Sequence, residues 1–235
     1  MFALPSTRRN PAVKQGRQAL GIVAMRRLAS FSLLLLLGSC IPQPRHPRGV
    51  QLPPPDDARA FNACLVDLAA LNAKVQQLPD RSWPNGCSAT HAVKLVAIGI
   101  PVTNLGAVKC GLARPFIQWV QQVVQQAAQA RFGSQVVKIE SFGSFACRPV
   151  NNVEGGRISE HGRADAIDIS AFDLADGRRV TVKEDWNGPD GKARAFLRDL
   201  HQAACRRFNV VLGPDANAFH QDHFHFDMGS GPYCR

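Results

Sequence analysis

The sequence predicts a single α+β domain, with helices near its N-terminus and a small antiparallel sheet formed by later segments of the chain. Apolar residues at helical spacing come first in the chain, and short segments of alternating polarity follow. Two of the alternating segments also place acidic and imidazole side chains on one face of a strand. With 235 residues, 45% of them hydrophobic, the chain is long enough for one ordinary domain with appendages.

Residues 1–39 form an expected signal region. Arg26 and Arg27 precede the apolar run 31–37, which is too short to span a bilayer but has the size of a signal-peptide core. The residues upstream of Met25 have the pattern of neither a signal nor a domain, so Met25 is an alternative start of translation.

Cys40 follows the small residues Gly38 and Ser39 directly after the apolar run. This arrangement resembles the lipobox of bacterial lipoproteins, in which the cysteine is lipidated and becomes the first residue of the mature chain. It implies a protein anchored to a membrane through Cys40 and facing the periplasm or cell envelope. The alternative is an ordinary cleaved signal followed by a chance cysteine.

Residues 40–57 are the expected tether between the anchor and a domain over residues 58–235. Six prolines between Ile41 and Asp57 prevent a helix and favour extended polyproline geometry. The acids at 56–57 suit the N-terminus of the first helix.

Three helices are expected within the domain. The first has apolar residues at helical spacing from Phe61 to Val75 and ends before Pro79, and the second covers about 112–130 and stops at Gly133. A third is predicted over about 191–208. Strands are predicted at 136–142, 166–170, 179–182, 209–212 and 223–228.

The cysteines after Cys40 are even in number, which in an exported chain implies disulfides. Fifteen pairings of six cysteines exist. Because short loops close at the least entropic cost, the expected pairs are neighbours in sequence. They are Cys64–Cys87, Cys110–Cys147 and Cys205–Cys234. The lack of a Cys-x-x-Cys pair argues against a zinc ribbon.

The net charge of +10 says little about partners, because the signal region alone carries six basic residues and no acid. Without that region the charge is about +4, which suits a solvated surface or an anionic wall polymer or lipid surface. Nucleic acid is not an expected partner in an exported compartment.

Two strands could carry a metal site. Because side chains alternate along a strand, His223, His225 and Asp227 share one face of the segment 223–228, and Asp168 lies on one face of the segment 166–170. If these strands are neighbours, Asp168 can approach His225, and a histidine in the preceding loop, His161, reaches the same point. Two imidazoles and one carboxylate match a catalytic zinc site with an open fourth position. Satisfied polar side chains or a non-catalytic metal are the alternatives.

The motifs resemble those of two related families. Ser159-x-His161, Ala166-x-Asp168 and the later His223-x-His225 are similar to the S-x-H-x-x-G-x-A-x-D and H-x-H motifs of the LAS superfamily, which comprises zinc D-Ala-D-Ala carboxypeptidases and peptidoglycan endopeptidases. The segments "SFACR", "SEHGRADAIDIS" and "VLGPDANAFHQDHFHFD", with the six cysteines, resemble the bacterial extensin-like C-terminal domain family. One departure is that alanine, Ala164, stands where the motif has glycine.

The resemblance implies a LAS/hedgehog-type DD-peptidase-like fold and a role for each site residue. His161, Asp168 and His225 would bind Zn²⁺, and His223 would be the catalytic base. Arg148 would offset oxyanion charge or hold a substrate carboxylate. The possible accessory residues are His220, which matches a histidine of the endopeptidase branch, and Ser159, which orients the loop.

The resemblance therefore implies a zinc metallopeptidase that acts on peptidoglycan stem peptides or cross-links, either as a carboxypeptidase or as an endopeptidase. The main alternative is a non-catalytic wall-binding or envelope-structural protein that retains the fold. A zinc hydrolase acting on some other amide is a third option.

Overall fold

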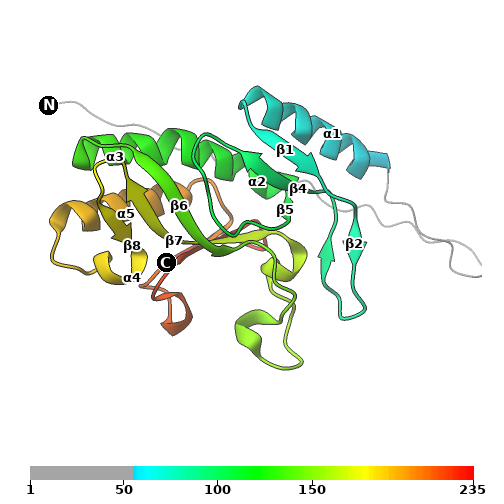
Figure 1. The fold of residues 1–235 in the computed structure, drawn as a ribbon. Coiled ribbons are helices and arrows are strands. Elements are labelled where there is room, and N and C mark those ends of the chain that lie inside the picture. The colour runs from blue at the N-terminus through cyan, green and yellow to red at the C-terminus, as the bar shows by residue number, and fades with distance from the viewer. Residues whose placement is uncertain (1–54) are drawn as a thin grey trace, which may run out of the picture. The chain divides into compact units, whose positions relative to one another are not determined.

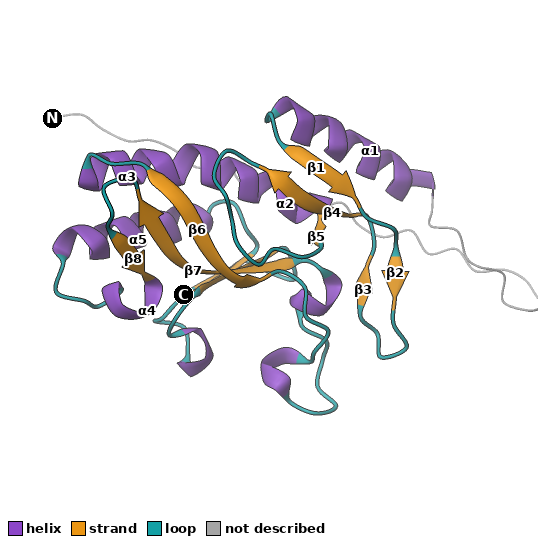
Figure 2. Ribbon diagram, viewed as in Figure 1, coloured by secondary structure: helices purple, strands orange, loops and turns teal. Residues whose placement is uncertain are grey.

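The computed structural model describes residues 55–235, and this part is a mixed α and β domain (Figures 1 and 2). Its first helix begins at Pro55. The signal region, Cys40 and most of the tether lie outside the described residues. No helix within 55–235 is long and apolar enough to cross a membrane.

The described chain contains five α-helices and eleven strands, most of them short. The helices are α1 (Pro55–Ala70), α2 (Cys110–Gln118), α3 (Gln125–Phe132), α4 (Val182–Asp185) and α5 (Gly191–Ala204), with a π-helical segment η1 (Trp119–Val124) between α2 and α3. Three short 3₁₀ turns are η2 (Val150–Asn152), η3 (Glu160–Arg163) and η4 (Ala218–His220). The strands are β1 (Lys74–Gln77), β2 (Arg81–Ser82), β3 (Ser88–Ala89), β4 (Ala92–Ala97), β5 (Val108–Lys109), β6 (Val136–Gly143), β7 (Ala166–Leu174), β8 (Arg179–Thr181), β9 (Val210–Leu212), β10 (Phe224–Asp227) and β11 (Tyr233–Cys234).

The main sheet has the order β11-β9-β10-β7-β6, and β8 pairs with β7. Its pairs are antiparallel except at the edge, where β11 runs parallel to β9. The expected antiparallel sheet is therefore correct for every pair except the β11–β9 pair. A second sheet has the order β1-β4-β5, and β2 and β3 form a separate two-stranded ribbon.

The core lies between the main sheet and the helical run α2–η1–α3 together with α5 (Figure 1). Trp119 is fully buried at its centre, with its ring edge-on to Phe226 at 5.1 Å and its indole N–H donated to the carbonyl of Leu200. Phe224 is also fully buried, so the even-numbered residues of β10 face the helices. The odd-numbered residues of β10 are left for the opposite face of the sheet.

The first predicted helix is too long. α1 ends at Ala70, and Val75 belongs to strand β1, which pairs with β4. Asn72 at the break has a positive φ of 54°, a conformation that ends a helix and turns the chain. The sequence pattern gave no strands between 71 and 109, although β1 to β5 all lie there.

The later elements follow the expectations closely. The second helix is part of a continuous helical run from Cys110 to Phe132 that stops at Gly133, where φ is 65°. The third helix ends at Ala204, four residues before the predicted end. All five predicted strands are present as β6 to β10, although Val182 belongs to α4 and not to the strand before it.

Two of the three expected disulfide pairs are wrong. The structure joins Cys64 to Cys110 and Cys87 to Cys147, and only Cys205–Cys234 is as expected. Doubling the length of a closed loop costs only about 0.6 kcal/mol, so loop entropy could not decide among these pairings. Packing decided instead. Helix α1 lies beside α2, and Trp83, next to the β2–β3 ribbon, packs against Phe145 in the loop after β6.

Candidate metal centre

Strands β7 and β10 are antiparallel neighbours, and their register pairs His225 directly with Asp168. The sequence allowed this approach only if the two strands are neighbours, and the pairing meets that condition. Because Phe224 and Phe226 are anchored in the core, His225 must point to the other face of the sheet. Ile167 and Ile169 fix the direction of Asp168 in the same way, since both are fully buried.

His161 reaches the same point from η3, the turn that leads into β7. The hydroxyl of Ser159 caps this turn by accepting the backbone N–H of His161 at 3.3 Å. Ala164 ends it with φ 57° and ψ 25°, the left-handed conformation in which its N–H bonds back to carbonyls of the turn. The position that carries glycine in the motif does therefore require a positive φ, and here alanine adopts it.

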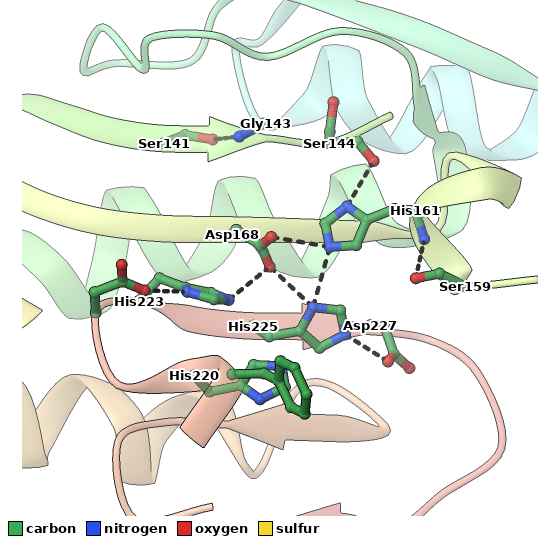
Figure 3. Close-up of polar contacts among 12 residues, drawn as sticks. Ser141, Gly143, Ser144, Ser159, His161, Asp168, His220, His223, His225 and Asp227 are labelled. Atoms are coloured by element: carbon green, nitrogen blue, oxygen red, sulfur yellow. Dashed lines mark hydrogen bonds and ion pairs between the residues drawn. The ribbon is translucent and has the colours of Figure 1, made fainter. Parts of the chain in front are cut away.

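Three ligand atoms meet between these elements (Figure 3). Nε2 of His161 lies 3.0 Å from Oδ2 of Asp168 and 3.2 Å from Nδ1 of His225, and that Nδ1 lies 2.9 Å from Oδ1 of Asp168. All three residues are buried.

The second nitrogen of each imidazole is already occupied. Nδ1 of His161 lies 3.2 Å from the carbonyl oxygen of Ser144, and Nε2 of His225 lies 2.8 Å from Oδ2 of Asp227. A carbonyl and a carboxylate can only accept, so each of these nitrogens carries the proton. The inner nitrogens, Nε2 of His161 and Nδ1 of His225, face each other and Asp168, so either protons or a metal ion must lie between them.

Zinc fits this donor set. Two ligands bound to one zinc at about 2.0–2.1 Å in tetrahedral geometry lie about 3.3 Å apart. The two nitrogens are 3.2 Å apart, and each lies 2.9–3.0 Å from one of the two oxygens of Asp168. Imidazole nitrogens and a carboxylate oxygen are ligands that zinc binds. Occupied second nitrogens are also typical of metal-bound histidines, because they fix the orientation of the ring.

Without a metal, protons would balance the charges. Burial opposes protonation of His225, but its hydrogen bonds to Asp168 and Asp227 raise its pKa to about 9. Burial alone would raise the pKa of Asp168, yet hydrogen bonds from His161 and His225 hold that pKa far below its usual range. The site therefore holds a stable carboxylate that attracts positive charge.

His223 lies beside the three ligand atoms but is held differently. Its Nδ1 is 2.8 Å from a carboxylate oxygen of Asp222, and its Nε2 is 3.6 Å from Oδ1 of Asp168 (Figure 3). The bond to Asp222 leaves the lone pair on Nε2, which faces the cluster. His223 can accept a proton there without being one of the three closest donors.

His220, on η4, lies next to His223 and His225, with ring centroids 5.1 Å and 5.6 Å away. Burial and the charges of those two histidines lower its pKa to about 4. A neutral His220, held by a contact of 2.8 Å between its Nδ1 and the side-chain oxygen of Asn217, forms one side of the site.

The cluster opens into a pocket of about 670 Å³. A second hollow of about 310 Å³ shares His161, Asp168, His223 and Arg148 with it. Arg148 is half-buried at the rim of both. Every site residue expected from the sequence therefore borders one concave region.

Three contributors were not assigned a role from the sequence. Asp227 holds His225, Asp222 holds His223, and the carbonyl of Ser144 holds His161. Asp227 could have been found, because it lies two residues after His225 and thus on the same strand face. Ser144 is distant in sequence, and only the folded chain reveals its contact.

A second group that could hold a metal consists of His201, Cys205 and Cys234. Its two sulfurs form a disulfide, so they are not available as thiolate ligands.

The model of the extensin-like protein C-terminus family matches residues 62–235, which is most of the chain and nearly all of its described part. Neither the comparison with curated proteins nor that with solved structures gives a match.

Proposed function

Because the chain belongs to the extensin-like protein C-terminus family and its site holds three convergent metal-ligand atoms, we propose that it is a zinc-dependent peptidase. Its substrates would be the stem peptides or cross-links of peptidoglycan. The observation that carries the proposal is the pair of imidazoles whose outer nitrogens are bonded and whose inner nitrogens converge on Asp168. The motif likeness to the LAS superfamily supports the same reaction.

The residues divide into ligands and a base. His161, Asp168 and His225 would hold the zinc, whose Lewis acidity lowers the pKa of a water to about 7. His223 would accept a proton at Nε2 and pass it to the leaving amine, while Asp222 keeps the ring in the required tautomer. Arg148, half-buried in the lining of the pocket, would either offset negative charge that develops on the substrate or hold a substrate carboxylate.

The cell envelope is the proposed location, with Cys40 as the lipid anchor and the proline-rich tether giving reach to the wall. Three disulfides in the described domain support an oxidising compartment.

The test combines metal content with product analysis. Purified protein should contain one zinc and release peptides from peptidoglycan that mass spectrometry can identify, and a chelator should abolish the release. His225→Ala should lose most of the metal, because it removes one of three ligands. His223→Ala should keep the metal and lose about 10²–10⁴-fold in rate, because it removes only the base.

Each result has a contrary outcome. If His225→Ala retains full zinc, the ligand assignment is wrong. If the unmutated protein holds zinc but releases nothing from any peptidoglycan, the alternative of a non-catalytic wall-binding protein replaces the peptidase.

A further inference from the structure

One wall of the large pocket is a short hairpin that carries two arginines. Segments 148–150 and 157–159 run antiparallel, with Pro149 and Ile158 as a bridged pair. Backbone bonds of 2.8 Å and 3.1 Å join the residues on either side of that pair. Residues opposite each other, and residues two apart, share a face of such a ribbon. The face that lines the pocket consists of Arg148, Val150, Arg157 and Ser159.

The opposite face of the hairpin is locked against the domain. Ile158 packs so closely on Gly162 that an added Cβ there would lie 2.6 Å from its Cγ2. The disulfide Cys87–Cys147 fixes the residue directly before Arg148. With Ile158 inserted on one side, Arg157 has to project from the other, toward the pocket.

Neither arginine has a charge partner. Among residues 55–235, no hydrogen bond or ion pair involves the guanidinium of Arg148 or Arg157. The acids that line the pocket are engaged elsewhere: Asp168 and Asp227 bond to histidines, and Glu160 lies 3.9 Å from Arg163. Two positive charges therefore face the pocket without compensation.

We infer that Arg157 acts with Arg148 as a carboxylate-binding wall, and that the substrate carries a free carboxylate on the part that occupies the large pocket. A guanidinium presents two parallel N–H donors that match a carboxylate, and two such groups on one rigid face can hold an anion in a fixed place. Arg157 is then a specificity-determining residue. This inference rests on the proposed peptidase function for the reaction itself.

The test uses two forms of one cross-linked stem peptide, with its carboxylates free or converted to carboxamides. Hydrolysis and binding are measured for the zinc-loaded unmutated protein, Arg157→Gln, Arg157→Lys and Arg206→Gln. Arg206 is a matched control, because it is exposed, lies outside the pocket and loses the same charge.

For the free carboxylate peptide, Arg157→Gln should raise KM about tenfold and leave kcat nearly unchanged, because a hydrogen bond to a charged group is lost. The carboxamide peptide should bind the unmutated protein more weakly and respond little to the same change. Arg157→Lys should raise KM less than Arg157→Gln does, since lysine keeps the positive charge but lacks the two parallel N–H donors of a guanidinium. Arg206→Gln should change neither peptide.

The inference is overturned if Arg157→Gln weakens the binding of both peptides equally, or if Arg157→Gln and Arg206→Gln have the same KM and affinity for each peptide. Absence of hydrolysis by the unmutated protein would instead refute the peptidase proposal. In that case the binding measurements would still test the carboxylate-binding wall. Equal binding of the carboxylate and carboxamide peptides would refute it.

Discussion

At the level of single residues, the chemistry of the site depends on which nitrogen of each imidazole carries a proton. His225 and His223 are two residues apart and face the same way, yet their carboxylate partners occupy different nitrogens. Asp227 binds Nε2 of His225 and leaves Nδ1 for the cluster, whereas Asp222 binds Nδ1 of His223 and leaves Nε2. This difference matches the two proposed roles, His225 as a metal ligand and His223 as the base.

Asp227→Asn should weaken zinc binding about 10–100-fold without abolishing it. The amide keeps the size of the side chain but no longer supplies the carboxylate that fixes and polarises His225. Titration against a competing chelator measures the change, and Asp173→Asn, which alters a carboxylate outside the site, is the control. If Asp227→Asn binds zinc with unchanged affinity, Asp227 does not contribute to the metal centre.

Ala164 shows how a residue can occupy a position that suits glycine. The left-handed conformation costs a non-glycine residue about 1–2 kcal/mol. Its methyl group is fully buried against a small cluster that includes Ala89 and Ala92, and burial of one such group recovers about 0.8 kcal/mol. Much of the cost is thereby offset, so the motif departure leaves the loop geometry intact.

At the level of elements, two glycines differ in whether the surrounding atoms leave room for a side chain. Gly162, in η3, lies against Ile158 and the sulfur of Cys87, where an added Cβ would be 2.6 Å and 3.0 Å from them. Gly111, in α2, has no atom within 4 Å of its added Cβ. The turn that carries His161 can approach the hairpin only because residue 162 has no side chain.

Gly162→Ala should lower the free energy of unfolding by about 1–3 kcal/mol through overpacking. Gly111→Ala, the matched control, should raise it by up to about 0.5 kcal/mol, because alanine favours helix. Urea denaturation of both variants measures the difference. Equal stability of the two proteins would show that the close approach at Gly162 is not a constraint.

At the level of the whole molecule, several carboxylates stabilise the fold only while they are charged. Hydrogen bonds from Arg179 and Lys138 lower the pKa of Glu140 from 4.5 to about 2. The hydrogen bonds from Arg178 and Trp186 likewise lower the pKa of Asp176 and that of Asp215. Since the folded chain then binds fewer protons than the unfolded chain, stability should fall as the pH drops from about 4.5 toward 2.

Burial acts in the opposite direction at two other acids. It raises the pKa of Glu160 and that of Asp165, so protonation of these two groups relieves a cost of folding as the pH falls. Glu160 and Asp165 therefore offset part of the loss of stability at low pH that Glu140, Asp176 and Asp215 cause.

Glu140→Gln should destabilise the protein at pH 7 by on the order of 1 kcal/mol, because it removes the ion pair with Arg179 that joins β6 to β8 and the ion pair with Lys138 within β6. The difference from the unmutated protein should shrink as the pH falls through 4.5 toward 2, where Glu140 itself becomes protonated. Denaturation at a series of pH values tests this, with Glu154→Gln as an exposed control. A constant difference across that range would contradict it.

The sequence by itself determined the elements that carry local signals. The alternation of the segments 166–170 and 223–228 correctly indicated which side chains face the core and which share a face with His225. Helix stripes and the glycine stop at Gly133 gave the second helix within two residues of each end. These features are readable because periodicity and termination signals depend on neighbours along the chain.

Only the tertiary structure decided what depends on contacts between distant residues. The disulfide pairs of Cys64 and Cys87 follow from the packing of α1 and of the β2–β3 ribbon, and loop entropy differs too little to choose among them. The second-nitrogen partner Ser144, and the face of the hairpin that presents Arg157, were fixed in the same way. Such choices depend on three-dimensional packing, in which small differences between large opposing energies select one arrangement.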